Sequence, residues 1–315
     1  MTQLYQNSPP IMNEPLISVI MTFKNSESFL PETMDSIFNQ TEGRFIIYAI
    51  NDGSTDNGEK YLSTIKDERL VLLSPGHVGL VKALNMGLSL VKTPYIAICD
   101  SDDIYLETRL ERQLNFLNHN KEYILVGANI NYFGTSSKRK WQIRLPNKDQ
   151  DIKKALIKGL NAIVHSTMMV RTEVMKKIGG YDEKYYPAPD YHLFLELSRY
   201  GKFANINNAL ANVRLHKTSI MTDNLYEALL KYEESRRAHL RLGYGSTRNQ
   251  RESLLYDKIF LKLRLIEFKG VTYYRKGIFY YVNNYLLRGF LFLLLGAFIS
   301  PRRSIVFISR LFWNN

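Results

Sequence analysis

Three carboxylates lie within four residues in the segment Asp100-Ser101-Asp102-Asp103, directly after the apolar run 95–99. Ionised carboxylates this close repel one another unless a positive charge lies between them. Mg2+ and Mn2+ prefer oxygen ligands and commonly share them with a diphosphate. Alternatively, Asp102 or Asp103 could cap a following helix, which is the more common role of an isolated Asp-x-Asp pattern. The position after a buried strand favours a metal site.

A second polar cluster, Asn51-Asp52-Gly53-Ser54, follows the apolar run 45–50. As a turn, this composition is ordinary. In a nucleotide site, Asp52 could accept the N3–H of a pyrimidine, and Ser54 or a backbone amide could reach one of the pyrimidine carbonyls. Alone the cluster is weak evidence, and its interpretation depends on the elements around it.

The elements that must position these clusters alternate between strand and helix. The spacing of apolar residues predicts strands over 16–23, 45–50, 70–73 and 95–99. It predicts helices that begin near Asn25 or Ser26, over 57–65 and 80–91, and up to about Asn118. Further along we predict strands over 123–132 and 141–145, a helix over 152–160, a short β segment over 165–170 and a helix over 191–200.

Continuous apolar strands that alternate with helices are typical of an α/β fold, a Rossmann-like, mostly parallel sheet with helices on both faces. Ligands of such sheets bind beyond the carboxyl ends of the strands. Residues 22–25, 51–54 and 100–103 all fall at that edge. The polar residues are therefore concentrated where the fold class predicts a binding site.

As a set, these segments closely resemble the family-2 inverting glycosyltransferases of the GT-A fold, of the bacterial surface-polysaccharide type. The resemblance covers residues 16–221 in the family's order. Besides 15–25, 51–56 and 95–103, the matching segments are 79–88, His165-Ser166-Thr167, Gly179-Gly180-Tyr181-Asp182-Glu183, Pro189-Asp190-Tyr191 and Arg214-Leu215-His216.

The resemblance implies a role for residues at the nucleotide edge. Thr22 and Phe23 would line the base, and Asp52 would hold a pyrimidine, most often uracil. Asp102, helped by Asp100, would bind the Mn2+ or Mg2+ that bridges the two phosphates of the donor.

Other implied roles concern the phosphates and the acceptor. Asp190 falls where the family keeps its general base. His216 lies in the segment that touches the diphosphate or the metal, and Lys82 stands where many relatives carry an Arg that can meet a phosphate. An inverting transfer needs both a base for the acceptor hydroxyl and a metal that stabilises the departing nucleotide.

Several residues depart from the family pattern or have a structural alternative. Pro189 replaces the usual Glu before the base, from which we expect altered loop geometry without loss of chemistry, and His192 replaces a common acidic residue. For His165 we favour a hydrogen-bonded structural role over an acceptor-site role. Gly179-Gly180 is typical of a turn that needs positive φ.

The charge distribution separates the C-terminal part from the rest. The 315 residues carry a formal net charge of +12, and residues 225–315 hold 16 Lys and Arg against 6 Asp and Glu. No acidic residue follows Glu267. A basic surface attracts phosphate groups, on lipids or on nucleic acid, although such charge can also be merely solvated. No nucleic-acid motif is recognisable in this part, so we expect an anionic membrane surface as partner and no nucleic acid.

The apolar stretch 278–300 contains the run 290–295 but also Asn283, Asn284 and Arg288. A spanning helix needs about 20 apolar residues. We therefore predict an interfacial helix, with a packing helix and a true span as alternatives. Arg302, Arg303 and Arg310 would flank it.

The sequence predicts three parts: a flexible N-terminus (1–14), a GT-A catalytic domain (15–221) and a basic, aromatic helical tail (222–315). Residues 1–14 contain no apolar run typical of a signal peptide. Cys99 is the single cysteine, which fits a reducing cytosol. We expect a cytoplasmic protein on the inner face of the cell membrane; no oligomeric state is indicated.

We predict a non-processive glycosyltransferase that moves one sugar from a nucleotide-diphosphate sugar, UDP-linked by preference, to a glycan or lipid-linked glycan. The Gln-x-x-Arg-Trp segment of processive synthases is absent. One alternative is a sugar-1-phosphate nucleotidyltransferase, which would need a Gly-rich, basic loop after the first strand that residues 22–26 do not supply. Another is a non-catalytic module that binds membranes or nucleic acid.

Overall fold

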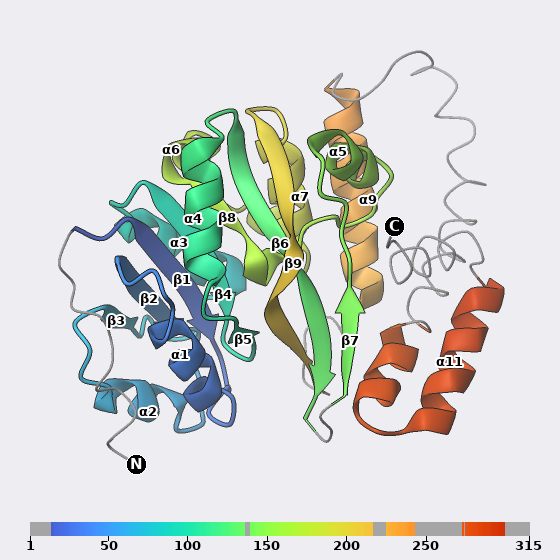
Figure 1. The fold of residues 1–315 in the computed structure, drawn as a ribbon, viewed down its shortest axis with the longest axis horizontal. Coiled ribbons are helices and arrows are strands. Elements are labelled where there is room, and N and C mark those ends of the chain that lie inside the picture. The colour runs from blue at the N-terminus through green and yellow to red at the C-terminus, as the bar shows by residue number, and fades with distance from the viewer. Residues whose placement is uncertain (1–13, 136–138, 217–224, 243–272, 274, 300–315) are drawn as a thin grey trace.

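A nine-stranded sheet runs through the part of the chain that the computed structural model describes, namely residues 14–135, 139–216, 225–242, 273 and 275–299 (Figure 1). The strand order is β3-β2-β1-β4-β8-β6-β9-β5, with β7 paired to β6. The predicted boundary near residue 221 and most of the predicted N-terminal segment lie outside the described residues, so both stay predictions.

The N-terminal half alternates between strand and helix, as the apolar pattern predicts. Strands β1, β2, β3 and β4 are all parallel to one another. In chain order the elements are β1 (Ile17–Phe23), α1 (Leu30–Phe38), β2 (Phe45–Asn51), α2 (Gly58–Thr64), β3 (Leu70–Leu73), α3 (Leu80–Leu90) and β4 (Tyr95–Asp100).

The second half extends the same sheet with strands of both directions. Strand β6 runs parallel to its neighbour β9, while β8, β7 and β5 are antiparallel to the strands they pair with. The elements are β5 (Ile104–Tyr105), α4 (Arg109–His119), β6 (Tyr123–Gly134), β7 (Lys140–Ile143), α5 (Asp149–Ile157), β8 (Met169–Arg171), α6 (Thr172–Lys177), α7 (Pro189–Leu197) and β9 (Lys202–Leu215), with 3-10 turns η1 (His165–Thr167) and η2 (Glu183–Tyr185).

Two apolar cores fill the space on the two faces of the sheet. Helices α1, α2 and α4 pack on one face against residues such as Val19 and Met21 of β1. Helices α3, α5, α6 and α7 pack on the other face, which Ile20 of the same strand joins. The sequence prediction of a mostly parallel α/β sheet with helices on both faces is confirmed.

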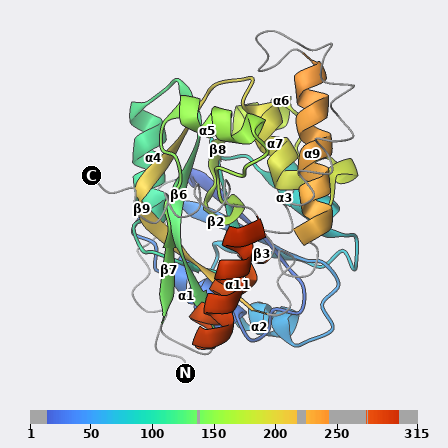
Figure 2. The same ribbon diagram turned by 90° about the vertical axis from the view of Figure 1, so that its right-hand side faces the viewer.

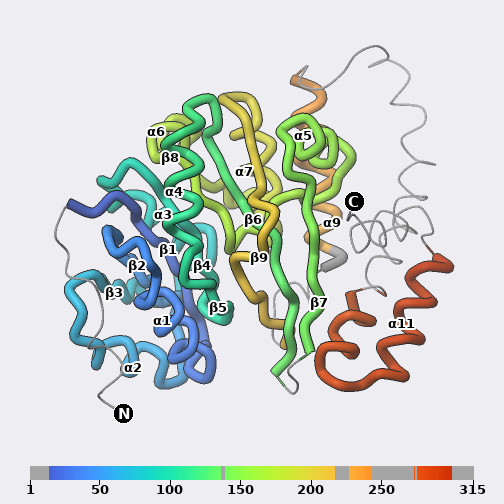
Figure 3. The backbone as a smooth tube through the Cα atoms, in the orientation of Figure 1, coloured from blue at the N-terminus to red at the C-terminus, as the bar shows by residue number. Residues whose placement is uncertain are grey.

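Strand β9 is the largest element that the sequence pattern did not predict. It pairs with β6 over nearly its whole length, and the backbone trace shows the two running side by side (Figure 3). Its sequence contains four Asn, a residue depleted in strands, and the β6–β9 register shifts near Asn129. The predicted β segment 165–170 is also corrected, because residues 165–167 form a 3-10 turn and the strand begins at Met169.

Two C-terminal pieces complete the described structure. Helix α9 (Leu225–Arg241) packs along α7, and α11 (Leu286–Ile299) stands beside the lower end of β7 (Figures 1 and 2). Residues 275–282 are helical and precede α11. Ile278 and Val282 are buried against Tyr132 and Trp141 of the sheet. None of the described helices is both long and apolar enough to cross a membrane.

Candidate active site

The carboxyl ends of β1, β2 and β4 meet at one edge of the sheet. Thr22 of β1 is in register with Asp100 of β4 and with Ile50 of β2, and Phe23 is in register with Asn51. The loops that follow these strands therefore start side by side. The structure brings together the polar clusters that the sequence placed at this edge.

The loop 100–103 is fixed by hydrogen bonds from α1 and β5. Tyr105 accepts the backbone N–H of Asp100 at 2.6 Å, and Ser101 Oγ lies 2.9 Å from Ser26 Oγ. Thr33 Oγ1 donates to the carbonyls of Ser101 and Asp103, at 3.1 and 2.8 Å. These hydrogen bonds fix the backbone of the loop and so preorganise its carboxylates for a ligand.

The three carboxylates of the loop lie close together but differ in role. One oxygen from each of Asp100, Asp102 and Asp103 lies within 4.8 Å of the others. Asp103 is only 1% exposed; Ser166 Oγ donates to its Oδ2 at 2.7 Å and the Arg214 backbone N–H to its Oδ1 at 3.0 Å. Burial raises the pKa of Asp103 well above its usual value, and the charges of Asp102 and Asp100 add to the shift. Asp103 therefore ties β9 and η1 to the loop.

Asp100 and Asp102 are the carboxylates that remain accessible. Half of the Asp100 side chain is exposed, and Asp102 Oδ2 lies 2.7 Å from His216 Nε2. The pKa of Asp100 is raised to about 7, first by partial desolvation of its carboxyl group and then by the negative charges of Asp102 and Asp190. Each ionised carboxylate in such a cluster opposes the ionisation of its neighbours, and a divalent cation with a preference for oxygen ligands relieves that repulsion.

A buried arginine lies beneath this loop. Arg109 is fully buried; its guanidinium donates to Ile98 O at 2.8 Å and to Gln113 Oε1 at 3.1 Å, and stands over the Tyr105 ring at 4.5 Å. Its positive charge lowers the pKa of Asp100 and so opposes the other shifts. No sequence pattern predicts a buried site for this residue, because an Arg in the first turn of a helix is usually exposed.

Arg214 connects the loop to α1 and β9. Its Nε donates to Asp102 O at 2.9 Å, and its Nη2 lies 2.5 Å from Glu32 Oε2. The ring of the next-but-one residue, His216, lies 4.6 Å from the Phe29 ring. The Arg214-Leu215-His216 segment thus reaches the carboxylates from the end of β9.

Asp52 lies at the carboxyl end of β2, beside the start of α3. Its Oδ1 accepts the backbone N–H groups of Val78 and Gly79, at 2.9 and 2.7 Å, and lies 3.1 Å from His77 Nδ1. No donor contacts its Oδ2 among the described residues. The Phe23 side chain, in contrast, is 2% exposed and belongs to the core, so only its backbone reaches the edge, where its carbonyl accepts the Asp52 N–H at 2.9 Å.

Asp190 is the second residue of α7, which begins with Pro189 at a position where proline fits a helix. Its negative charge contributes to the raised pKa of Asp100 and of Tyr181. His165 lies beside Asp100, with its Nδ1 4.0 Å from Asp100 Oδ1 and its Nε2 2.7 Å from Tyr181 Oη. Burial lowers the pKa of His165, and the negative charge of Asp190 opposes that shift. Asp190 is therefore close enough to act electrostatically on Asp100, His165 and Tyr181.

The remaining predicted residues lie around this site. Lys82 on α3 is exposed and lies 3.7 Å from Glu183. Asp182, in the matching segment 179–183, accepts the Lys184 N–H at 2.9 Å and caps η2. His192 stacks on Tyr185 and packs toward α9, away from Asp190.

Gly179 and Gly180 both have positive φ, as the sequence predicted. A Cβ on Gly180 would lie 2.6 Å from Asn85 Oδ1, and this side chain bonds the backbone of Tyr181. The two glycines therefore permit the turn that brings Tyr181 against His165.

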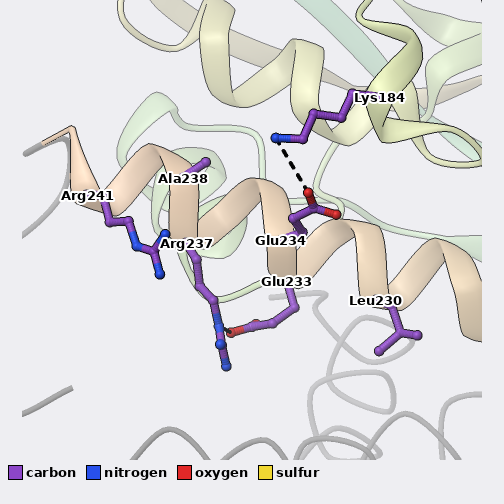
Figure 4. A pocket seen from close by; sticks show the side chains of 7 residues that line it. All are labelled: Lys184, Leu230, Glu233, Glu234, Arg237, Ala238 and Arg241. Atoms are coloured by element: carbon purple, nitrogen blue, oxygen red, sulfur yellow. Dashed lines mark hydrogen bonds and ion pairs between the residues drawn. The ribbon is translucent and has the colours of Figure 1, made fainter. Parts of the chain in front are cut away.

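Two cavities lie away from the carboxylates, beside α9. One, of about 360 Å3, is lined by Lys184, Leu230, Glu233, Glu234, Arg237, Ala238 and Arg241 (Figure 4). Its charged groups pair with one another, with Lys184 Nζ 3.6 Å from Glu234 and Arg237 Nε 2.9 Å from Glu233. The other, of about 270 Å3, lies between the 178–185 turn, α7 and the end of α9. Neither cavity is lined by Asp52, Asp100, Asp102 or Asp190.

Comparison with known sequences identifies the family. Residues 18–179 match the family model described as glycosyl transferase family 2. A relative from Haemophilus influenzae, described as an uncharacterized glycosyltransferase, is 33% identical over 216 residues, which is 65% of this chain and 67% of the relative. Another uncharacterized glycosyltransferase, from Methanocaldococcus jannaschii, is 29% identical over 65% of this chain and 72% of its own. The chain belongs to glycosyl transferase family 2.

Solved structures show the same fold. S. aureus TarS 1-349 in complex with UDP-GlcNAc superposes with a TM-score of 0.57 at 14% identity, over 95% of this chain and 93% of that one. The mannosyltransferase PcManGT from Pyrobaculum calidifontis, in complex with GDP-Man and Mn2+, gives 0.51 at 15% identity, over 91% and 89%. Both are glycosyltransferases of the GT-A type, which agrees with the fold predicted from the sequence. Membership of this family favours a glycosyltransferase over the two alternatives that the sequence left open, a sugar-1-phosphate nucleotidyltransferase and a non-catalytic binding module.

Proposed function

We propose that this chain is an inverting, non-processive, metal-dependent glycosyltransferase. It moves one sugar from a UDP-sugar to a hydroxyl of a glycan or lipid-linked glycan during cell-surface polysaccharide synthesis. The observation that carries the proposal is the carboxylate cluster of Asp100 and Asp102 after β4, together with Asp190, which is near enough for its charge to raise the pKa of Asp100. These are the two sets of carboxylates that the reaction needs, one for a cation and one for a proton.

In this reaction the acceptor oxygen bonds to the anomeric carbon while the bond to the diphosphate breaks on the opposite side. Asp190 takes the proton of the acceptor hydroxyl. Asp100 and Asp102 would hold Mn2+ or Mg2+, with His216 2.7 Å from Asp102. A bound divalent ion supplies Lewis-acid stabilisation of the leaving diphosphate. The Mn2+ in the related mannosyltransferase structure supports this part of the proposal.

A uridine donor fits the surroundings of Asp52. Because Oδ1 already accepts two backbone N–H groups, Oδ2 is the oxygen that can accept one N–H of a base. Uracil offers a single N3–H, whereas guanine offers two adjacent donors on its edge. The UDP and UDP-GlcNAc complexes of TarS support the same choice. We expect UDP to bind at least about tenfold more tightly than GDP, the effect of one good hydrogen-bond match.

The experiment that tests the proposal measures UDP release from a set of UDP-sugars by the full chain, with Mn2+ or with EDTA. NMR of the glycoside product reports the anomeric configuration. We expect release with at least one UDP-sugar, loss of release in EDTA, and inversion. Retention of configuration, or full release in EDTA, would show that the proposal is wrong.

We further propose that the enzyme works at the cytoplasmic face of an anionic membrane, which α11 contacts. On this helix and the residue before it, eight large apolar side chains are at least 46% exposed: Tyr285, Leu286, Leu287, Phe290, Leu291, Leu294, Leu295 and Phe298. Such a patch is rare on a monomer without a partner. Arg288 and Lys276 are exposed nearby, and no acidic residue follows Glu267, so the charge favours anionic lipid over an acidic protein surface.

The membrane proposal is tested by sedimentation with phosphatidylglycerol vesicles and with phosphatidylcholine vesicles. We expect the chain to follow the anionic vesicles, high salt to release much of it, and Phe290→Glu with Leu294→Glu to abolish binding. Leu242→Glu, at an exposed leucine near the end of α9, is the matched control. Self-association in solution with no vesicle binding would instead assign the patch to a second copy of the chain.

A further inference from the structure

Asn161 lies between α5 and η1, and its side chain has partners on both the active site and α9. Its Oδ1 accepts the backbone N–H of Ile163 at 3.3 Å, which fixes the orientation of the amide. Its Nδ2 donates to Asp190 Oδ2 at 3.0 Å and to Tyr232 Oη at 3.3 Å. Both hydrogens and the oxygen of this amide are therefore used.

Tyr232, the second partner of the Asn161 amide, is fixed by burial and by stacking on a neighbouring tyrosine. It comes from α9, is 5% exposed, and stacks on Tyr191 with ring centroids 4.2 Å apart and an interplanar angle of 15°. Tyr191 directly follows Asp190 in α7, and its hydroxyl donates to Leu156 O of α5. Burial raises the pKa of Tyr232, so the hydroxyl stays neutral. Two adjacent residues of α7 are thus tied to α5 and α9.

We propose that Asn161 is a positioning residue that holds the carboxylate of Asp190 for the acceptor hydroxyl, and that Tyr232 of α9 fixes Asn161. The inference rests on the proposed function, because it takes Asp190 as the base. A donor on Oδ2 restricts rotation of the carboxylate and leaves Oδ1 for the proton of the acceptor. On this proposal α9, which like Asp190 lies beyond residues 18–179 that match the family model, contributes to the active site through Tyr232.

The test compares Asn161→Ala, Tyr232→Phe and a control, Tyr95→Phe. Tyr95 is also buried and its hydroxyl also bonds an asparagine, Asn118, at 2.7 Å, but it lies at the opposite end of β4 from Asp100. We expect kcat to fall about 10- to 100-fold in Asn161→Ala and about 3- to 10-fold in Tyr232→Phe, the range for a misplaced catalytic group. The donor KM should stay within about twofold, and Tyr95→Phe should keep normal kcat.

A double substitution separates positioning from a general structural role. If Asn161 acts through Asp190, then Asn161→Ala costs little more once Asp190→Asn has removed the base. A further full loss in the Asp190→Asn background, or unchanged kcat in both Asn161→Ala and Tyr232→Phe, would overturn this inference alone. Near-normal turnover of Asp190→Asn by itself would overturn the proposed base and this inference with it. Tyr232→Phe tests the same chain of contacts if Asn161→Ala does not fold.

Discussion

Replacing Asp102 by Asn separates metal binding from folding, because the two side chains have the same shape. Among the described residues, the Asp102 side chain bonds His216 Nε2 at 2.7 Å, and an Asn amide can donate to or accept from that ring nitrogen. We therefore expect the free energy of unfolding to change by no more than about 1 kcal/mol, the net worth of one hydrogen bond.

The effect on the cation should be much larger. Two unit charges 4 Å apart interact by about 4 kcal/mol at an effective dielectric constant of 20, and solvent contact lowers that figure. A loss of about 2 to 4 kcal/mol corresponds to roughly 30- to 1,000-fold weaker Mn2+ binding. At saturating Mn2+, turnover should still be about 10²- to 10³-fold lower, as when one electrostatic stabiliser is removed.

The assay is UDP release over a Mn2+ titration, together with UDP binding and thermal unfolding of the same samples. Asp151→Asn on α5 is the control, since it removes one charge from an exposed aspartate outside the site. The reasoning is refuted if Asp102→Asn keeps the Mn2+ dependence and turnover of the wild type, or if the wild type is fully active in EDTA.

Four further predictions follow from the same structure. Asp190→Asn should keep donor affinity within a few-fold while kcat falls about 10²- to 10⁴-fold in steady-state kinetics; normal turnover would place the base elsewhere. The pKa of Asp100 is raised to about 7 in the folded chain, whereas an aspartate in an unfolded chain has a pKa of about 4, so this group lowers stability as pH rises between those two values and adds no slope above pH 7. Thermal unfolding should show metal-free stability declining from about pH 5 to 7 and levelling above it, and Mn2+ affinity should be about tenfold weaker at pH 6 than at pH 8, because protons compete with the metal below pH 7; a flat profile from pH 5 to 7 would contradict this. Arg109→Met should cost roughly 2–6 kcal/mol in urea unfolding, because the buried acceptors Ile98 O and Gln113 Oε1 lose their donor, at about 1–3 kcal/mol each; a change below about 1 kcal/mol would contradict it. Ending the chain after Glu267 removes Ile278 and Val282 from their contacts with Tyr132 and Trp141, so stability should fall by roughly 3–5 kcal/mol; an unchanged Tm would argue against that packing.

The sheet edge was predictable because the signals for it are local. Apolar runs such as 45–50 and 95–99 end abruptly in polar clusters, and parallel strands bring their carboxyl ends together whatever the details of packing. The positions of Asp52, Asp100 and Asp102 follow from that rule. Their partners, Gly79 and His216, lie farther along the chain, so the rule alone does not supply them.

Other features depended on tertiary contacts that no local pattern records. Strand β9 carries Asn at positions where the alternation should be apolar, and it forms because Asn205 and Asn212 find side-chain or carbonyl partners in neighbouring elements. Arg109 and Asn161 look like ordinary surface residues in the sequence. The fold buries the first beneath the carboxylates and places the second between α7 and α9.

The helical segment 275–282 that precedes α11 contacts the end of β9, and this contact has a consequence for how the enzyme would encounter its acceptor. Asn283 donates to Leu215 O at 3.3 Å, and the next residue, His216, reaches Asp102. With α11 in the lipid interface, as proposed, the catalytic edge would stay at a fixed height above the bilayer. The search for a lipid-linked acceptor then becomes lateral diffusion in two dimensions, at a high effective concentration. A fixed height would also select acceptors by length, because the hydroxyl of an acceptor that is too short or too long would not reach Asp190.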